Sequence, residues 1–247
     1  TPVEEFPKIY KELGEEIAVI KKELIEEELP KIVFAAGLDT GRPALSGVLI
    51  KEAGHRLIVV ATDGFRLSLK EHEGLSGKKT KKEVFFLVPS RVVRELILMS
   101  EEEGDVKLYA PKESNQIIFE QNDTVLVGRL IEAEFPSFEK IIPKKSSTKT
   151  VFDKEEMQKA IKTCHVFAKE SANIVKMHIE ENRVVVSSSS PSVGQNLVEV
   201  DAKKTGEDTE IAFNARYLLD FFSNVSAEKI ALETTGSLNP GVFKIDK

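Results

Sequence analysis

An internal repeat constrains this chain most, because it divides the sequence into two halves built on one plan. The stretch Val88–Leu96 and the stretch Phe213–Phe221, 125 residues further on (213 − 88 = 125), share one order of residue types. Each reads apolar, helix cap, small residue, arginine, three helix positions, acid, apolar. The β-like runs that follow also correspond, with Val106–Tyr109 and Ile117–Glu120 matching Ile230–Glu233 and Val242–Ile245. A repeat this long is not a solenoid unit and indicates duplicated domains.

The same pattern predicts the fold class. Each half is expected to contain a strand, a helix, three strands, a second helix and three more strands. With so few helices per strand, antiparallel sheets covered by two helices on one face are the natural architecture. The fold class is therefore predicted as α+β, with two tandem domains of this kind.

The boundary between the halves is expected in the stretch 134–148. It contains Pro136 and Pro143, a lysine pair and a run of small polar residues, a composition typical of a linker. We therefore predict one domain over 1–145 and a second over 146–247.

Local signals predict individual helices. Apolar residues recur at helical spacing over 22–37, where Pro30 predicts a kink or a late helix start near Leu29. Asp153 has the character of an N-cap, with Glu156 three positions on, for a helix over 155–169. Asn214 is expected to cap the helix that follows it.

Composition excludes several classes of protein. The 247 residues are 41% hydrophobic, which fits a globular protein. The net charge of −6 argues against a protein that binds nucleic acid over its whole surface. Cys164 is the single cysteine, so neither a disulfide framework nor a structural zinc site is expected. The four histidines lack metal-ligand spacing. We predict no metal, no cofactor, no membrane association and a cytoplasmic protein.

An enzyme is the first alternative class. It would use Asp63 as nucleophile or base, Arg66 as an anion clamp and Ser187–Ser190 as a phosphate-binding run. The sequence has no glycine-rich phosphate loop before a helix, no G-x-S-x-G elbow and no histidine paired with a nucleophile in a known motif. We therefore predict no catalytic residues.

Four motifs in one order carry a family resemblance. The run Val59–Ser68, with sequence VVATDGFRLS, resembles the signature of the β subunit of bacterial DNA polymerase III. Arg42–Leu49, Phe135–Pro143 and Ile211–Leu219 agree with that family in order and spacing. The resemblance covers essentially the whole chain.

The resemblance implies a replicative sliding clamp. Family subunits carry three copies of one fold, and two subunits close a homodimeric ring around duplex DNA without reading its sequence. The two halves are similar to the second and third domains, so the first domain and the last C-terminal strand are expected to be missing here. The implied partners are duplex DNA, the polymerase III alpha subunit, the clamp loader delta subunit and other proteins that carry the clamp-binding motif.

The resemblance also implies a cleft that accepts a partner peptide with apolar side chains. Its residues would be Leu45, Thr62, Gly64, Phe65, Arg66, Leu67, Pro136, Lys140, Ile141, Asn214, Tyr217, Leu238 and Pro240. Phe65 departs from the family, where histidine is frequent, and should make the cleft more apolar. From pattern alone, Leu45, Leu67 and Ile141 read as core residues, Thr62 and Asp63 as a structural turn, and Tyr217 as an ordinary helix residue.

Positive charge facing DNA would come from the helices and one loop. The candidates are Lys31, Arg42, Arg91, Arg94, Lys159 and Lys162, for which solvated helix faces are the alternative interpretation. Val166 and Phe167 fall where the resemblance implies the subunit contact. A different function also fits the sequence: a truncated adaptor that binds such peptides but does not encircle DNA.

Overall fold

The structure is a computed structural model that describes residues 10, 12–14, 16–39, 41–54, 56–73, 80–100, 103–111, 114–192 and 194–246. The chain divides into two compact units, Thr1–Pro136 and Ser137–Lys247. Each unit has its own hydrophobic core. We describe the units separately.

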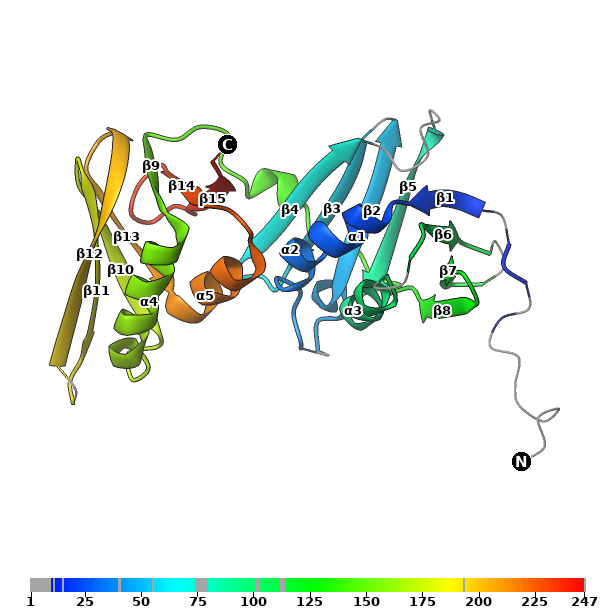
Figure 1. Ribbon diagram of the computed structural model, residues 1–247, viewed down its shortest axis with the longest axis horizontal. Coiled ribbons are helices and arrows are strands. Elements are labelled where there is room, and N and C mark those ends of the chain that lie inside the picture. The colour runs from blue at the N-terminus through cyan, green and yellow to red at the C-terminus, as the bar shows by residue number, and fades with distance from the viewer. Residues whose placement is uncertain are drawn as a thin grey trace. The chain divides into compact units, whose positions relative to one another are not determined.

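Within its described residues, unit 1 contains two four-stranded antiparallel sheets and three α-helices (Figure 1). The first sheet has the order β4-β3-β2-β5 and the second β1-β6-β7-β8. The elements are β1 (Glu16–Ile20), α1 (Lys22–Glu27), α2 (Pro30–Val33), the 3-10 helix η2 (Pro43–Ser46), β2 (Gly47–Gly54), β3 (Arg56–Thr62), β4 (Leu67–Glu73), β5 (Thr80–Pro89), α3 (Ser90–Met99), β6 (Val106–Tyr109), β7 (Gln116–Gln121) and β8 (Thr124–Arg129).

The predicted interruption of the first helix is confirmed. Helix α1 ends at Glu27, and α2 begins at Pro30, which occupies its first turn. Proline has no backbone N–H to donate and is best accommodated there. The helices and both sheets contribute to the core of unit 1. Ile25, Ile32 and Val93 from the helices pack there with strand residues of both sheets, among them Val48 and Phe119.

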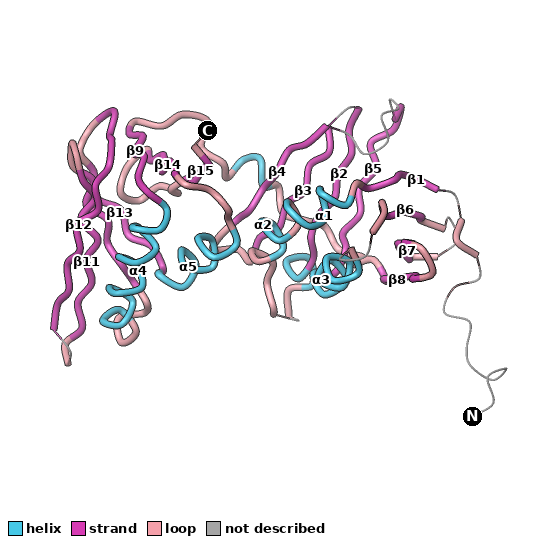
Figure 2. Tube along the Cα trace, in the orientation of Figure 1, coloured by secondary structure: helices cyan, strands magenta, loops and turns pink. Residues whose placement is uncertain are grey.

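The described part of unit 2 contains one seven-stranded antiparallel sheet of order β13-β10-β11-β12-β9-β14-β15 and two α-helices. Figure 1 shows α4 and α5 side by side, and Figure 2 shows β10 to β13 as one layer. The elements are the 3-10 helix η3 (Phe138–Lys140), β9 (Thr148–Asp153), α4 (Lys154–Ala168), β10 (Ile174–Ile179), β11 (Arg183–Ser190), β12 (Gly194–Gly206), β13 (Thr209–Asn214), α5 (Ala215–Asn224), β14 (Lys229–Thr234) and β15 (Val242–Ile245).

Strand β12 makes the sheet of unit 2 continuous. Its first part pairs with β11, from Gly194 to Asp201, and its last part pairs with β9, from Ala202 to Gly206. The sequence pattern predicts only a short strand over 197–200, because the residues on either side are mostly polar and give no strand signal. The strand has 13 residues, and neighbouring strands supply its backbone partners.

The predicted caps in unit 2 are confirmed. The carboxylate of Asp153 accepts a hydrogen bond from the Glu156 amide at 2.9 Å, at the start of α4. The side chain of Asn214 accepts one from the Arg216 amide at 3.0 Å, at the start of α5. Both satisfy amide groups that the first helical turn leaves without partners.

The two units share one topology. The order β4-β3-β2-β5 in unit 1 matches β12-β11-β10-β13 in unit 2, and β1-β6-β7 matches β9-β14-β15. The predicted fold class is confirmed. The predicted count of strands needs correction: four strands, not three, separate the two helical regions in each unit, because β5 and β13 precede the second helix directly. In unit 2, two strands rather than three follow α5 within the described residues.

Candidate functional site

The connection between β3 and β4 carries most of the motif VVATDGFRLS and is a closely bonded turn. The carboxylate oxygen Oδ1 of Asp63 accepts from the backbone amides of Phe65 and Arg66, both at 2.9 Å. The hydroxyl of Thr62 donates to the Arg66 carbonyl at 2.6 Å and accepts from the Gly64 amide at 3.0 Å. Aspartate and threonine side chains stabilise turns in this way because they bond to backbone groups a few residues ahead.

Glycine is required at position 64 by its backbone conformation. Its φ of +94° lies in the left-handed region that other residues rarely adopt. A Cβ atom added there would also come within 3.3 Å of the Arg42 guanidinium and 3.6 Å of Leu45. The turn therefore packs directly against η2, which brings Arg42, Leu45 and Gly64 together.

Arg66 is directed into unit 1. Its Nε lies 3.1 Å from Asp63 Oδ2, and a terminal nitrogen donates to the Phe34 carbonyl at 3.1 Å. Its guanidinium carbon also lies 5.4 Å from the centre of the Phe34 ring. Only 19% of the side chain is exposed. The guanidinium thus links the turn to the end of α2, a role that the sequence analysis did not assign to Phe34 or Asp63.

Phe65 has the opposite environment. It is 76% exposed at the tip of the turn, whereas Leu45 and Thr62 are buried. Leu67, the first residue of β4, is half-buried. Among the predicted peptide residues of unit 1, Phe65 therefore has by far the most accessible apolar side chain.

The other predicted peptide residues occupy separate elements. Pro136, at the end of unit 1, is half-buried. In unit 2, Lys140 and Ile141 are exposed at the end of η3, with Ile141 57% exposed. Asn214 and Tyr217 are half-buried around the start of α5. Leu238 and Pro240 lie exposed in the β14–β15 connection.

The predicted DNA-facing residues of unit 1 differ in how far their charge is already paired. Lys31 lies 3.3 Å from Glu28, with only 20% of its side chain exposed. Arg42 lies 3.6 Å from Asp39, and Arg94 donates to the Val33 carbonyl at 3.4 Å. Arg91 is exposed on α3. Lys31 therefore offers the least positive charge to a ligand.

Glu28 is the centre of a partly buried ion-pair cluster. Burial alone raises the pKa of this carboxyl, but the ammonium groups of Lys70, at 3.0 Å, and Lys31 outweigh it and hold the pKa below its usual range. The cluster joins the break between α1 and α2 to strand β4.

The predicted basic and interface residues of unit 2 lie on one helix. Lys159 and Lys162 are exposed on α4, and Lys159 lies 3.9 Å from Glu155. Val166 is 58% exposed near the end of the same helix, and Phe167 is half-buried.

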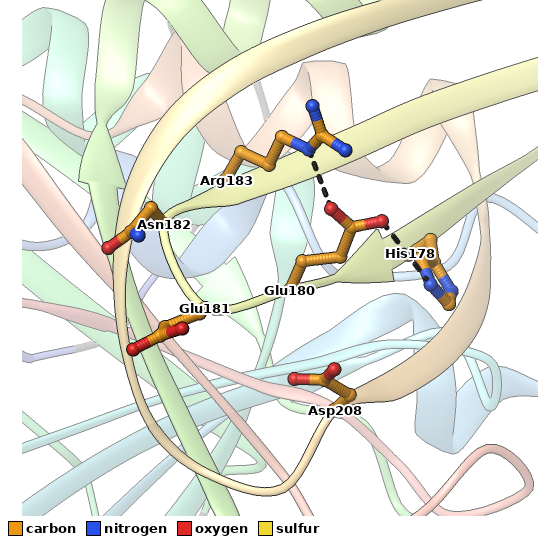
Figure 3. Close-up of a pocket in the computed structure, with 6 residues that line it drawn as sticks. All are labelled: His178, Glu180, Glu181, Asn182, Arg183 and Asp208. Atoms are coloured by element: carbon orange, nitrogen blue, oxygen red, sulfur yellow. Dashed lines mark hydrogen bonds and ion pairs between the residues drawn. The ribbon is translucent and has the colours of Figure 1, made fainter.

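An open cavity of about 460 Å³ lies elsewhere in unit 2, at the β10–β11 and β12–β13 connections. It is lined by His178, Glu180, Glu181, Asn182, Arg183 and Asp208. Figure 3 shows the Glu180 carboxylate between Arg183, at 2.6 Å, and His178, at 3.6 Å. None of the predicted site residues lines this cavity. Within the described part of the chain, no group of three or more His, Cys, Asp or Glu residues could hold a metal ion.

No helix in the described residues has the length and apolar character needed to span a bilayer.

Comparison with protein families places both units in one family. Residues 19–137 match the central domain of the DNA polymerase III beta subunit, and residues 139–245 match its C-terminal domain. The beta sliding clamp of Chlamydia pneumoniae is 29% identical over 221 residues, which are 90% of this chain and 59% of that protein. The beta sliding clamp of Staphylococcus aureus is 30% identical over 216 residues, 85% of this chain and 55% of that protein.

Solved structures agree with this assignment. The DNA polymerase III beta subunit of Thermotoga maritima has a TM-score of 0.88 and 30% identity, over 98% of this chain and 65% of that one. The beta chain of Streptococcus pneumoniae has a TM-score of 0.90 and 26% identity, over 99% and 64%. The chain spans little more than half the length of the curated relatives. It belongs to the DNA polymerase III beta subunit family of non-catalytic sliding clamps and carries the central and C-terminal domains of that family.

Proposed function

We propose that this chain acts as a DNA polymerase processivity factor, which encircles duplex DNA and binds its partners through a short peptide motif. The observation that carries the proposal is the match of both units, in order, to the clamp domains. The bonded turn Thr62–Leu67 supports it, because the resemblance implies a peptide site at this motif. The proposed place of action is the cytoplasm.

The proposed peptide site has apolar anchors and few polar groups, as extended peptides require. In unit 1 it uses the turn residues Thr62 to Leu67 together with Leu45 and Pro136. In unit 2 its proposed residues are Lys140, Ile141, Asn214, Tyr217, Leu238 and Pro240. Phe65, Ile141 and Leu238 are exposed and are the proposed apolar contacts of the peptide.

The proposed DNA contact is diffuse and independent of sequence. A clamp that slides needs positive charge toward the phosphates and no contact with base edges. Exposed Arg91, Lys159 and Lys162 fit that need, with Arg42 and Arg94 adding charge and Lys31 contributing less because of Glu28. The net charge of −6 confines such contact to a limited part of the surface.

The proposed partners follow from the family. They are duplex DNA, the polymerase III alpha subunit, the clamp loader delta subunit and other proteins with the clamp-binding motif. The whole protein is proposed to form a homodimeric ring, to which Val166 and Phe167 would contribute a subunit contact.

Two measurements test the proposal and separate it from an adaptor that binds only peptides. The first is fluorescence anisotropy of a labelled peptide that carries the clamp-binding sequence of a bacterial polymerase III alpha subunit. We expect saturable binding that Leu45→Ala and Tyr217→Ala each weaken. Without saturable binding, the peptide function is wrong.

The second measurement is retention on DNA. The whole protein, as the proposed homodimeric ring, should stay on nicked circular plasmid after incubation with clamp loader and ATP, and should leave after linearisation. The triple variant Arg91→Glu, Lys159→Glu, Lys162→Glu should reduce retention while peptide binding persists, and Lys176→Glu serves as a matched control on an exposed strand. Peptide binding with no retention on circular DNA supports the adaptor instead.

A further inference from the structure

The serines of Ser187–Ser190 divide between the two faces of β11, because side chains alternate along a strand. Ser188 and Ser190 are buried, at 8% and 5% exposure. Ser187 is half-buried and Ser189 is exposed on the opposite face. The buried face of β11 packs against α4 in the core of unit 2. The two buried hydroxyls therefore lie on the helix side of the strand.

Ser188 holds the last turn of α4. Its hydroxyl donates to the Cys164 carbonyl at 2.7 Å, and the Cys164 thiol donates to the Val186 carbonyl at 3.4 Å. Both hydrogen bonds are buried, so water does not compete for these groups. Helix α4 is thereby bonded to β11 one turn before its end at Ala168.

Glu170 holds the turn that follows the helix. Its carboxylate oxygen Oε2 accepts from the Ser190 hydroxyl at 2.6 Å and also from the Ser192 hydroxyl. In the opposite direction, the Ser171 hydroxyl donates to the Ser189 carbonyl at 2.6 Å. These bonds join the turn after α4 to the end of β11.

The same turn contains strained backbone. Ala172 and Asn173 have φ values of +54° and +59°, in the left-handed region that disfavours residues with a Cβ atom. Such strain persists only where the surrounding structure holds it. The Asn173 amide donates to the Ala168 carbonyl at 2.9 Å, and the Asn173 carbonyl accepts from the Ala215 amide at 2.7 Å. The end of α4 is therefore held in one conformation from several sides.

We infer that Ser188 and Glu170 are positioning residues, which hold the end of α4 for the subunit contact proposed at Val166 and Phe167. This inference rests on the proposed homodimeric ring, so the partner is a second copy of the whole protein. Val166 is 58% exposed and Phe167 is half-buried. Both lie between Cys164, which Ser188 holds, and Glu170, so the bonded positions enclose the contact on either side.

The expected effect of these bonds is a lower cost of association. The last turn of a helix frays when nothing holds it, and a surface that becomes ordered on binding loses part of its affinity. A helix end that is bonded to its own sheet presents apolar side chains that are already ordered. Ser188 and Glu170 act in this way without touching the partner subunit.

The first test uses Ser188→Ala in the whole protein. We expect the dissociation constant of the homodimer, measured by analytical ultracentrifugation, to rise by about 2- to 12-fold, the usual contribution of one hydrogen bond. Ser187→Ala is the matched control, because this serine precedes Ser188 in β11 and lies on the opposite face. Its dissociation constant should equal that of the unmodified protein. An equal constant for Ser188→Ala contradicts its positioning role.

Glu170 requires a test that separates positioning from a charge contact with the partner. Glu170→Ala removes the acceptor of two serine hydroxyls and should weaken the dimer. Glu170→Gln keeps an acceptor oxygen without the charge and should restore most of the affinity. If Glu170→Gln binds as weakly as Glu170→Ala, the charge itself binds the partner and the positioning role is wrong. Glu181→Ala, which removes an exposed carboxylate at the opposite end of β11, is the control and should have no effect.

Hydrogen exchange shows whether the helix end is the part that changes. In Ser188→Ala and Glu170→Ala, the amides of the last turn of α4 should exchange faster than in the unmodified protein. The amides of its first turn, which Asp153 caps, should exchange as before. Faster exchange along the whole helix would mean general destabilisation and would contradict a role confined to the contact.

Coupling to Val166 gives a further readout. Val166→Ala should weaken the dimer, because it removes apolar area from the proposed contact. Adding Ser188→Ala should then cost less than Ser188→Ala alone, since a contact that is already reduced depends less on the position of the helix. Fully additive losses contradict the inference.

The outcomes separate this inference from the proposed function. If the unmodified whole protein forms no homodimer, both the ring and the positioning role are wrong. If it forms a homodimer that Ser188→Ala and Glu170→Ala leave unchanged, the ring stands and only the positioning role is wrong.

Discussion

The two units share a topology but stabilise it by different means. In unit 2, both helices begin with a capping side chain, and β12 links all strands into one sheet. In unit 1, no N-cap residue of the three α-helices bonds its own helix through its side chain in the described residues, and the strands form two sheets. Because the topology is common to both, its origin is the shared apolar pattern and not the caps or the continuous sheet.

The hydrophobic cores of the two units also differ in side chains although the topology is the same. In the repeated stretches, Leu96 of α3 takes the position of Phe221 in α5, and Ile97 that of Phe222. Unit 2 surrounds Phe222 with Phe152, Phe221 and Phe243, whose ring centres lie 5.2–6.4 Å from its own. Unit 1 fills the matching helix positions with aliphatic side chains. One backbone arrangement thus accepts either kind of packing, provided that total volume and pattern are kept.

The junction of β12 with β9 gives the largest expected effect. Gly206 has a φ of +99°, and a Cβ there would lie 2.0 Å from the Ser147 carbonyl oxygen. Gly206→Ala should cost about 2–5 kcal/mol, the sum of about 1–2 kcal/mol for the left-handed backbone and about 1–3 kcal/mol for overlap in a packed region. Urea unfolding followed by circular dichroism measures the loss.

Gly194 is the matched control at the other end of β12. It has the same φ of +99°, but an added Cβ would meet nothing within 4 Å. Gly194→Ala should therefore cost only about 1–2 kcal/mol. Equal losses in the two variants would mean that backbone strain alone matters and that the close β12–β9 junction does not explain the continuous sheet.

The caps of unit 2 give the next effect. Asp153→Ala and Asn214→Ala should each cost about 1 kcal/mol, because each leaves a helix amide without its partner. Asp153→Asn keeps an acceptor and should recover most of that loss. Calorimetric unfolding measures the three variants. If alanine at both positions costs nothing, the caps do not distinguish the units.

Much of this organisation could be predicted from the sequence. Strands β7, β10 and β15 and the caps Asp153 and Asn214 carry local signals: a short apolar run in β7 and β15, alternating burial in β10, or a polar residue directly before an amphipathic helix. The length of β12 could not be predicted, because its ends are polar and are fixed by partner strands rather than by their own composition.

The candidate site was less predictable. The motif pointed to Thr62, Gly64 and Arg66, but a sequence does not say whether a polar side chain faces a ligand or its own backbone. From pattern alone Thr62 and Asp63 read as a structural turn, and the hydrogen bonds of both side chains to the backbone agree with that interpretation. The bond from Arg66 to the Phe34 carbonyl joins residues 32 positions apart, and no local pattern indicates it.

Glu28 gives a smaller effect on stability, and acid removes it. Unit 1 has a broken helix where unit 2 has the continuous α4, and Glu28 at the break pairs with Lys70 and Lys31. Its pKa is lowered in the folded chain, so its stabilisation is complete above the usual value near 4.5 and is lost as pH falls through the lowered pKa. Glu28→Gln should cost less than about 1 kcal/mol near neutral pH and remove part of the acid loss. Urea unfolding at several pH values is the measurement, and an acid loss identical in both proteins would contradict this role.

Tyr109 has the smallest effect on stability at neutral pH, and at alkaline pH it distinguishes unit 1 from unit 2. Its hydroxyl donates to Glu120 at 2.7 Å across the β6–β7 hairpin, where Glu120 also lies 3.6 Å from Lys107. The matching hairpin of unit 2 has the ion pair of Glu233 with Lys244 at 2.6 Å. The hydrogen bond to Glu120, with burial and the charge of that carboxylate, raises the pKa of Tyr109 to about 12. A raised pKa stabilises the fold fully below the ordinary value of 10.0, and this contribution is lost as pH rises toward about 12. Phenolate absorbance should therefore show one tyrosine that ionises late, and Tyr109→Phe should remove it together with its share of the alkaline loss. If the late tyrosine persists in Tyr109→Phe, the raised pKa belongs to another residue and the contrast between the hairpins does not hold.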